Sequence, residues 1–554
     1  MSYSIMERIQ RGLKRGDADF IDAVYDLFGE FRDKYRQIEW GRLDYNEQMY
    51  KGNHWYGVEV TDPKEPRPTT PIIQSTIENI KADLSDEYPE AVIRPEDIGD
   101  EILAKALTEV VRQTLEDIDY ELEYDQLVHD LLVGGWMVQE SGWDITRNYG
   151  KGGAFLRRVS NKNFMCDPYV SNIQQGRACF KFDRLPKDWF RQHYPNKFPG
   201  MQDDEFILDS NHPDFGSTTS PDEIDFAYLI EAWFRFYDPR AKRYAVHMVK
   251  LAGRQVLENS YRVSPSGYFT HGEYPFIVTP LFESKGSALG YGIVDMFKNP
   301  QRFSDKLDQI MMQNAFMASR PKLFVSRASG LDMEDVSDYS QNVHEGDNIT
   351  DAMVRWFNPP SLPSYMMNYI ASIRQSIKEE SGSNDFSRGN VSSGVTAASA
   401  ITALQEMSTK RRRREARRLH SGFKQGIRQM LEVIRQYDDA ERQLSITYQG
   451  VPIMFKGTRA LWKTIDNGTM LPIECNVSIE PMRKTRFTKL AQNQLVLEFC
   501  GMFQGQIDPA ILMEAMDFPD QAVVLEKLRA ASGKGVKAMQ DEIDMLSTEL
   551  EKAS

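Results

Sequence analysis

The sequence contains little cysteine and little histidine, with 4 cysteines and 8 histidines among 554 residues. The cysteines are scattered, form no CxxC pair and have no cluster of histidines near them: Cys166, Cys179, Cys475 and Cys500. Structural zinc sites and disulfide frameworks depend on closely spaced ligands or on regular pairs. The pattern therefore argues against both and favours buried or incidental thiols in a reducing compartment.

The sequence also has no long hydrophobic run. No stretch reaches the roughly eighteen consecutive apolar residues that a membrane-spanning helix needs. The first residues, MSYSIMERIQRGLKRGDADF, have no apolar centre of the signal-peptide kind and look like the start of an amphipathic helix. We therefore expect neither a membrane span nor secretion.

Motifs for catalysis are missing as well. ASGKGVK resembles the end of a phosphate-binding loop, but it lacks the earlier glycine, and Gly535 stands where Ser or Thr should hold Mg²⁺. The acidic run Asp203, Asp204 and Glu205 lies among polar residues, which favours a solvated loop over a metal site. We predict no catalytic residue, metal ligand or cofactor. One alternative stays open: a nucleic-acid-processing enzyme whose atypical metal site is formed by carboxylates that converge only in the fold.

The sequence is rich in charged residues, and they are unevenly distributed along the chain. The chain carries a net charge of −14, with a 41% hydrophobic and 27% charged composition typical of a folded protein. An acidic surface repels phosphate at long range, which argues against a protein that coats nucleic acid. Yet the stretch STKRRRREARRL at 408–419 holds seven basic residues and one acidic residue.

This arginine run has three possible interpretations. It could bind DNA phosphates, form a solvated helix face, or pair with acidic residues of a neighbouring subunit or of the same chain. Every face of these helical turns is polar, so we expect little core contact here, and we favour the ion pairs. The arginines concerned are Arg411, Arg412, Arg413, Arg414, Arg417 and Arg418.

Hydrophobic periodicity predicts the first half of the chain. A stripe of isoleucine and leucine predicts a helix over 71–88, which Pro89 should end. EAVIRP is predicted to be a strand, and two further helices are predicted over 101–119 and 121–133. The middle, roughly 135–285, is rich in strand-like segments such as AYLIEAWFRFYDP.

Four aromatic residues lie close together near the N-terminus: Trp40, Tyr50, Trp55 and Tyr56. Aromatic side chains stack on nucleic-acid bases in many single-strand-binding proteins. A place in a domain core is the favoured interpretation for these four.

Two long helices are predicted on either side of a mixed module of strands and turns. In the first, Asn299 should cap the helix, Pro300 should occupy its first position, and Arg320 before Pro321 should end it. At about 1.5 Å per residue, this helix would be about 30 Å long. The second is predicted over 364–380.

A polar loop and a very long helix follow. SGSNDFSRGNVSSG has the composition of an exposed loop. The helix is predicted over about 396–438, with an apolar stripe in its second half: Leu419, Phe423, Ile427, Met430 and Ile434. Beyond it, LSITYQGVPIMFKG and IECNVSIEP predict strands, and the C-terminal part is predicted to be helical.

The order of these elements resembles the portal proteins of tailed bacteriophages. Three stretches add to the resemblance: YKGNHWYG with RPTTPIIQSTIENIKADLSDEYPEAVIRP, then YPFIVTPLFESKGSALGYGIVDMFKNPQRFSDKL, then ESGSNDFSRGNVSSGVTAASAITALQE. They are similar to the N-terminal segment, the approach to the first stem helix, and the loop and helix start that follow the second. The resemblance covers roughly residues 40–440 and is nearest to podovirus-like portals without a large C-terminal barrel.

This resemblance implies an α+β, multi-domain portal fold: an α/β wing, a two-helix stem, a small α/β clip, a long wing helix and a helical C-terminal crown. The implied boundaries are 1–50 for an N-terminal helical arm, 51–289 for the wing, 290–320 and 361–381 for the stem helices, 321–360 for the clip, 382–395 for the channel loop, 396–440 for the long helix, 441–490 for the returning wing strands and 491–554 for the crown.

The resemblance also implies a structural, non-enzymatic role. The chain would be one subunit of a ring of about twelve copies at one capsid vertex, through which double-stranded DNA passes during packaging and ejection. Its implied partners are further copies of itself, the terminase large subunit, head-tail adaptor and tail proteins, and the major capsid and scaffolding proteins. It would reside in the virion, and in the host cytoplasm during assembly. No cofactor is implied.

Two groups of residues become candidates for transient contact with the passing DNA. The channel loop contributes Asn384, Ser387, Arg388 and Asn390, and the first stem helix contributes Lys298, Arg302 and Lys306. The arginine run would lie where one subunit meets the next. Since about twelve copies would carry roughly −170 in total, the channel would hold its polyanionic cargo weakly.

Overall fold

A computed structural model describes the following residues: 4–15, 18–59, 65–86, 88–96, 100–200, 226–239, 242–319, 322–327, 330–332, 354–357, 363, 365–381, 410–438, 443–448, 451–456, 463–466, 469–472 and 475–481. The chain forms two compact units, one made of Met1–Ser85 and Ala91–Glu480, the other of Asp86–Glu90 and Pro481–Ser554. Almost all of the second unit lies outside the described residues.

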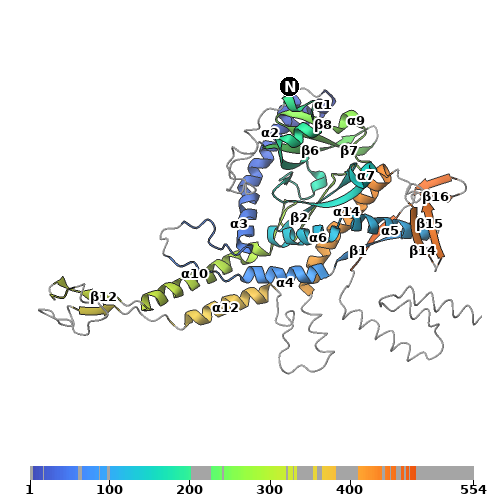
Figure 1. The fold of residues 1–554 in the computed structure, drawn as a ribbon. Helices are drawn as coiled ribbons and strands as arrows, with labels where there is room; N and C mark the ends of the chain where they lie inside the picture. Colours follow the sequence, from blue (N-terminus) through green and yellow to red (C-terminus); the bar gives the residue numbers. More distant parts are fainter. Residues whose placement is uncertain are drawn as a thin grey trace, which may run out of the picture. The chain divides into compact units, whose positions relative to one another are not determined.

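The N-terminal segment is helical. Helices α1 (Ile5–Arg15) and α2 (Ala18–Tyr35) are followed by a π-helical turn at Arg36–Trp40 and by α3 (Gly41–Tyr50) (Figure 1). Phe28 and Phe31 of α2 meet the ring of Phe180 edge-on, with ring centroids 5.3 and 5.4 Å apart. These contacts fix α2 against a β-sheet of the central domain.

That domain contains two antiparallel sheets. The five-stranded sheet has the order β4 (Phe164–Cys166), β5 (Ala178–Pro186), β6 (Phe226–Asp238), β7 (Arg243–Ala252) and β8 (Gln255–Asn259). The three-stranded sheet has the order β3 (Gly153–Val159), β2 (Trp136–Asp144) and β9 (Phe276–Pro280). Short helices α7 (Arg147–Gly150), α8 (Lys187–His193) and α9 (Ser260–Val263) lie between strands. The β-rich middle predicted from the sequence is therefore confirmed.

Apolar and charged contacts join these layers. Phe164 of β4 packs on Phe276 of β9, with ring centroids 4.9 Å apart. Nearby, the buried Lys181 Nζ lies 3.0 Å from Glu140 Oε2. Burial opposes ionisation, but Lys181 and Arg157 hold the pKa of Glu140 below its usual value.

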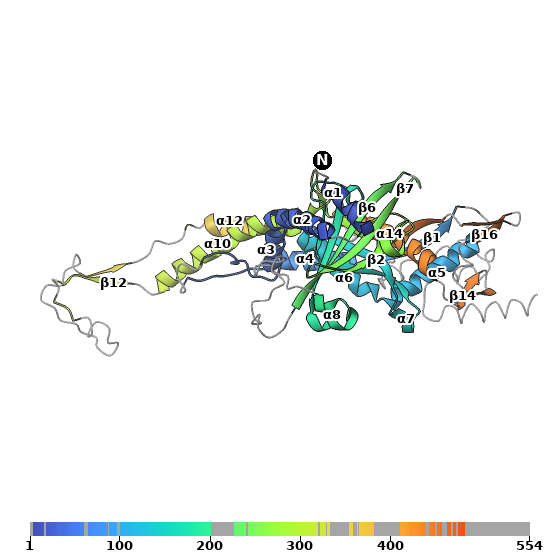
Figure 2. The same cartoon turned by 90° about the horizontal axis from the view of Figure 1, so that it is seen from above.

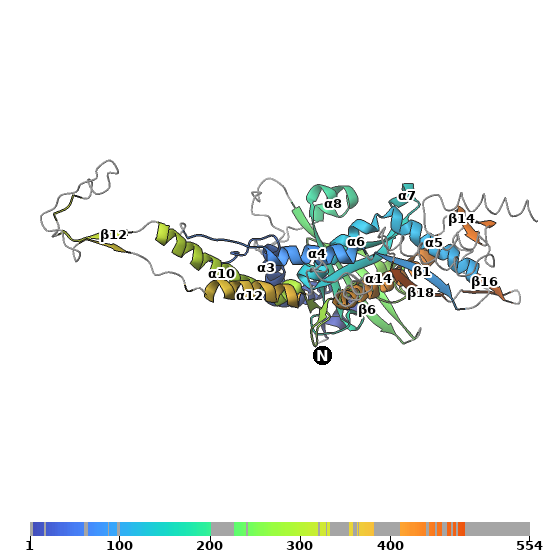
Figure 3. The ribbon, with the colours of Figure 1, turned by 90° about the horizontal axis from the view of Figure 1, so that it is seen from below.

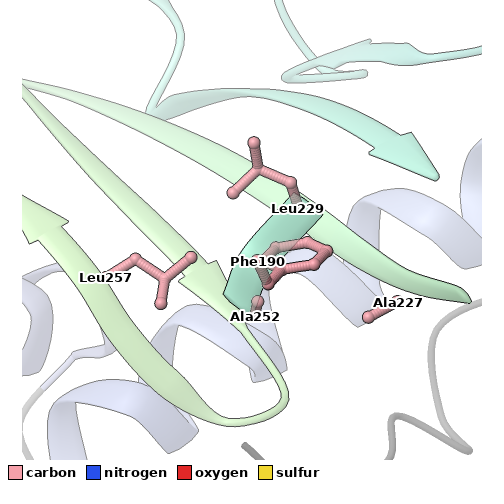
Figure 4. Close-up of a cluster of buried hydrophobic side chains, with 5 residues drawn as sticks. All are labelled: Phe190, Ala227, Leu229, Ala252 and Leu257. Carbon is pink, nitrogen blue, oxygen red and sulfur yellow. The ribbon is translucent and has the colours of Figure 1, made fainter. Parts of the chain in front are cut away.

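A second, smaller apolar cluster surrounds Phe190 of α8. Figure 4 shows this ring among aliphatic side chains from three strands of the five-stranded sheet: Ala227, Leu229, Ala252 and Leu257. Through this cluster the short helix is packed onto the sheet.

The predicted helices before the sheets are confirmed with small shifts at their ends. They are α4 (Ile72–Asp86), α5 (Glu101–Asp117) and α6 (Tyr120–His129), the last continuing into a π-helical turn at Asp130–Gly134. EAVIRP lies in strand β1 (Pro89–Pro95), which pairs with β18 (Cys475–Pro481). The predicted strands before residue 481 are likewise present, as the hairpin of β14 (Gln443–Tyr448) and β15 (Val451–Lys456) and as β18 itself.

Helices α10 (Ile293–Ser319) and α12 (Tyr365–Glu380) lie side by side, with strands β12 (Lys322–Val325) and β13 (Val354–Phe357) beyond the far end of α10 (Figures 1, 2 and 3). The two strands pair antiparallel, Lys322 opposite Phe357. A short ladder of β10 (Phe282–Glu283) and β11 (Gly290–Tyr291) precedes α10.

The predicted start of α10 is wrong. Asn299 and Pro300 lie inside the helix, which begins at Ile293. Burial of Ile293, Val294 and Phe297 stabilises the additional turns before Pro300. Proline lacks a backbone N–H, so the helix forgoes one hydrogen bond there without ending.

Helix α14 (Lys410–Tyr437) confirms the predicted apolar stripe, because all five of its members are buried: Leu419, Phe423, Ile427, Met430 and Ile434. The helix packs against β2, β3 and β9. The predicted start near residue 396 lies outside the described residues. A further hairpin, β16 (Lys463–Asp466) with β17 (Thr469–Pro472), lies within the 441–490 range expected to hold returning strands, although its segments were not individually predicted.

The molecule is thus a mixed α+β fold with long helices and several small antiparallel sheets, as expected. The predicted C-terminal helices lie outside the described residues. Among the helices that the structure describes, none is both long enough and apolar enough to cross a membrane.

Candidate assembly surfaces and channel residues

The first turn of α10 is fixed to the central domain by tight backbone packing. Gly135, between the π-helical turn and β2, has a φ of +90°, and a Cβ there would lie 2.4 Å from the backbone nitrogen of Gly292. Arg42 Nη1 of α3 lies 2.5 Å from Asp295 Oδ2 at the start of α10. Burial tends to raise the pKa of Asp295, but Arg42 and Lys298 hold this pKa below its usual value.

Farther along, α10 buries a polar face against its own chain. Gln301, Ser304, Asp305 and Gln309 are only 0, 0, 2 and 4% exposed. The buried His54 lies next to this face, with its Nδ1 2.7 Å from Asp305 Oδ2. This face therefore has a dense hydrogen-bonding environment in place of an apolar core.

The segment 65–70 runs along the same face of α10. Gln301 Nε2 donates to the Thr70 carbonyl oxygen at 2.7 Å, and Gln309 Nε2 donates to the Pro66 carbonyl oxygen at 2.9 Å. The backbone N–H of Thr70 donates to Asp305 Oδ1 at 3.3 Å. We call this set of contacts between α10 and residues 54–70 the polar seam.

One arginine of α12 extends the polar seam. Arg374 Nη2 lies 2.6 Å from Asp308 Oδ2, and Arg374 Nε donates to Ser304 Oγ at 3.3 Å. The same guanidinium reaches Thr70 Oγ1 at 3.4 Å. Arg374 therefore connects α12, α10 and the 65–70 segment.

One of the exposed sides of α10 is apolar. Four side chains spaced seven residues apart are 47, 67, 45 and 46% exposed: Met296, Phe303, Ile310 and Met317. We call them the α10 stripe. An ordinary surface helix buries its apolar face and exposes its polar face. In α10 the side opposite the polar seam is instead apolar and exposed.

The predicted stem residues lie on a third side of α10. Lys298 Nζ and the Arg302 guanidinium lie 5.8 and 6.0 Å from the ring centre of Tyr45, and Lys306 Nζ lies 4.6 Å from that of Trp55. Lys298 also pairs with Asp295 at 2.9 Å. Their proposed orientation toward a channel stays a prediction. The loop residues Asn384, Ser387, Arg388 and Asn390 lie outside the described residues.

The arginine run is part of α14. Arg413, Arg414 and Arg417 are exposed, while Arg418 Nη2 lies 2.7 Å from Glu283 Oε1. The Arg414 guanidinium lies 5.9 Å from the ring centre of Phe282. The side chains of Arg411 and Arg412 lie outside the described residues.

The expectation of little core contact in this run is wrong at two positions. Glu415 and Ala416 are only 7 and 4% exposed. The helix is therefore already packed on the domain at this point, and the exposed arginines project from a fixed surface. Whether they meet a second subunit stays a prediction.

Beside α14 lies an open groove of about 1030 Å³, lined in part by Glu273, Glu283, Arg418, Arg428 and Gln429. Its charges are already engaged within the chain to a large extent, as in the Arg418–Glu283 pair. No group of three or more His, Cys, Asp or Glu side chains suited to a metal ion occurs in the part of the chain that the structure describes.

The four N-terminal aromatic side chains pack or form hydrogen bonds within the same chain. Trp40 is only 6% exposed, and Trp55 Nε1 donates to the Pro68 carbonyl oxygen at 3.1 Å. The hydroxyl of Tyr50 donates to Glu78, and that of Tyr56 donates to Asp44. Core packing explains Trp40, whereas Tyr56 stays 41% exposed.

The polar seam is what the sequence reasoning missed. The four-residue spacing of Gln301, Asp305 and Gln309 places them on one helical face, and this spacing was the available signal. The identity of their partners was not available, because residues 54–70 are more than two hundred positions away.

Comparison with known proteins identifies the family of the chain. A search of curated proteins finds no match. The family model described as phage P22-like portal protein matches residues 41–552, which is nearly the whole chain and extends well beyond the part on which the sequence resemblance rested. Because that model covers far more than half of the chain, the chain belongs to the phage P22-like portal proteins.

Proposed function

We propose that this chain is one subunit of a ring of about twelve identical copies whose central channel admits double-stranded DNA into the capsid and releases it. Members of the family are structural, non-enzymatic phage proteins with a portal role in DNA packaging. The ATPase that drives packaging then belongs to a partner.

The observation that carries the proposal is the pair of helices α10 and α12 with the β12–β13 ladder beyond them. We assign α10 and α12 to the stem and residues 321–360 to the clip, where terminase and later the adaptor or tail proteins would dock. The sheets with α14 would form the wing, the residues around 382–395 the channel loop, and residues 491–554 the crown.

Charge supports transit of DNA without tight binding. With −14 per chain, about twelve copies carry roughly −170, which repels a polyanion at long range. Transient contacts would come from the loop residues Asn384, Ser387, Arg388 and Asn390 and from Lys298, Arg302 and Lys306 of α10. Changing Arg388 to Ala should alter DNA retention while leaving the ring intact.

The experiment that tests the proposal is native mass spectrometry of the purified protein combined with negative-stain class averages. We expect a ring of about twelve subunits with a central hole. A monomer or dimer that persists at high protein concentration, and in the presence of scaffolding protein, would refute the proposed ring.

A further inference from the structure

We propose that the α10 stripe binds a second copy of this chain, and that its counterpart is the exposed aromatic surface at the start of the neighbour's α12. That surface is formed by Tyr365 and Tyr369, which lie about one helical turn apart and are 69 and 59% exposed. The proposal rests on the proposed ring and specifies which surfaces close it.

The first argument is that α10 buries polar side chains and exposes apolar ones. Its buried polar side chains already have partners in the same chain: Gln301 and Gln309 with backbone carbonyls, and Asp305 with His54. Its apolar stripe instead faces outward. Exposed apolar surface of this extent on a folded subunit marks an interaction site. The helix is therefore incomplete as a packed element until another molecule covers the stripe.

The second argument is how exposed apolar side chains are distributed. Half of the large hydrophobic side chains that are exposed in the described residues lie between Met296 and Tyr369. The remaining half are spread over the rest of the first unit, from Ile38 to Tyr291. The concentration on α10, β12 and α12 indicates one shared partner surface in this region.

The third argument identifies the partner as a second copy. A closed ring of identical subunits uses two unlike faces, because each subunit must bind one neighbour with one face and the other neighbour with another. Helices α10 and α12 offer two such faces.

The fourth argument is that the α10 stripe and the α12 surface lie at the same height along the helix pair. Arg374 of α12 meets Asp308 and Ser304 of α10. The two helices run antiparallel and each rises about 1.5 Å per residue. Tyr365 therefore lies at about the level of Met317 along the pair. In a ring whose axis follows the stem, Met317 of one copy and Tyr365 of the next also share that level.

The first test changes Phe303 and Ile310 together to Gln. The double variant should keep the thermal unfolding of the monomer and lose rings, with the ring fraction reduced at least tenfold in native mass spectra. The matched control changes Ile145 and Val263 to Gln; these are 74 and 88% exposed and lie outside the two surfaces. The control should form rings like the wild type.

The outcomes separate two kinds of failure. If the wild type forms no ring, the proposed function fails. If the wild type and the Phe303/Ile310 variant form rings equally well, the assignment of the α10 stripe is overturned while the ring stands.

A second test does not depend on losing assembly. Phe303→Cys should react with a maleimide at least tenfold more slowly in the ring than in the monomer, whereas Ile145→Cys should react equally fast in both. Labelling is quantified by peptide mass spectrometry, so the native cysteines do not interfere. Equal labelling of Cys at position 303 in both states would overturn the proposal, because the stripe would then face another partner or a lipid surface.

A third test addresses the counterpart. Met317→Cys and Tyr365→Cys are placed in two copies that carry different tags, and the copies are assembled together under mild oxidation. A disulfide between the tags can only join two subunits. We expect this product, and its absence from rings that otherwise form normally would overturn the assignment to α12.

Discussion

His247 of β7 is a buried residue with a clear consequence for pH. Burial lowers the pKa of its imidazole to about 4, because the charged form would lose its hydration. The ring packs against that of Tyr261, with centroids 5.0 Å apart. In the unfolded chain the pKa returns to about 6.5. Between these two pKa values, the unfolded state therefore binds a proton on His247 that the folded state does not bind.

From this it follows that acidification destabilises the fold. Between pH 7 and pH 5, His247 should reduce the free energy of unfolding by about 2 kcal/mol. Urea denaturation at the two pH values measures this loss. The control is His247→Gln, in which the loss should be smaller by that amount, since other titrating groups such as His271 act equally in both proteins. Equal losses in the two proteins would contradict the prediction.

Gly135 gives a second prediction at the residue scale. Gly135→Ala should destabilise the protein by about 3 kcal/mol or more, because the new Cβ would meet the backbone of Tyr291 and Gly292 and φ is +90°. Gly52→Ala is the matched control: φ is +83° but no atom lies within 4 Å of the added Cβ. It should cost only about 1 kcal/mol. Thermal unfolding compares the two, and equal shifts would refute the role of the close approach.

At the scale of elements, α14 was predictable and α10 only in part. The α14 stripe follows the helical period, and its partner is a sheet that accepts any regular apolar face. The α10 start was misplaced because local rules for Asn299 and Pro300 were applied, whereas burial of Ile293 and Phe297 decides the boundary. Its polar seam was not predictable because hydrogen-bond partners far apart in sequence become neighbours only through the fold.

Arg374 tests the connection between α12 and α10. Arg374→Gln removes the charged partner of Asp308 Oδ2, which also accepts from Thr70 Oγ1, and should weaken local packing of α12 by about 1–2 kcal/mol. Hydrogen exchange of the α12 amides should become about tenfold faster as a result. Gln375→Ala, on the same helix and bonded to the exposed Glu379, is the control and should leave exchange unchanged. Unchanged exchange in the Arg374 variant would show that other contacts hold α12.

At the scale of the whole molecule, the arginine run opposes the net charge of the chain. Changing Arg411, Arg412, Arg413 and Arg414 together to Ala should lower ring yield, because the acidic residues at a subunit boundary of an acidic ring would lose their cationic partners. Native mass spectrometry measures the yield. Arg435→Ala, farther along α14, is the control.

Two other results are informative for this variant. Unchanged ring yield and stability would refute the ion-pair interpretation. Intact rings with reduced affinity for double-stranded DNA would instead support direct binding of nucleic acid by the arginines. The reduction should then grow with the number of phosphates that are no longer neutralised, and it should be most visible at low salt.

The polar and apolar sides of α10 also bear on how the assembled protein would carry mechanical load. Toward its own chain the helix makes short, directional side-chain hydrogen bonds, which break after small displacements. Toward its neighbour, the proposed contacts are non-directional and survive small sliding movements. Under axial force the stem helices of all subunits would therefore move together, while the wing of each subunit adjusts separately. The rigid body in the assembly would then be the ring of stems and not the single chain.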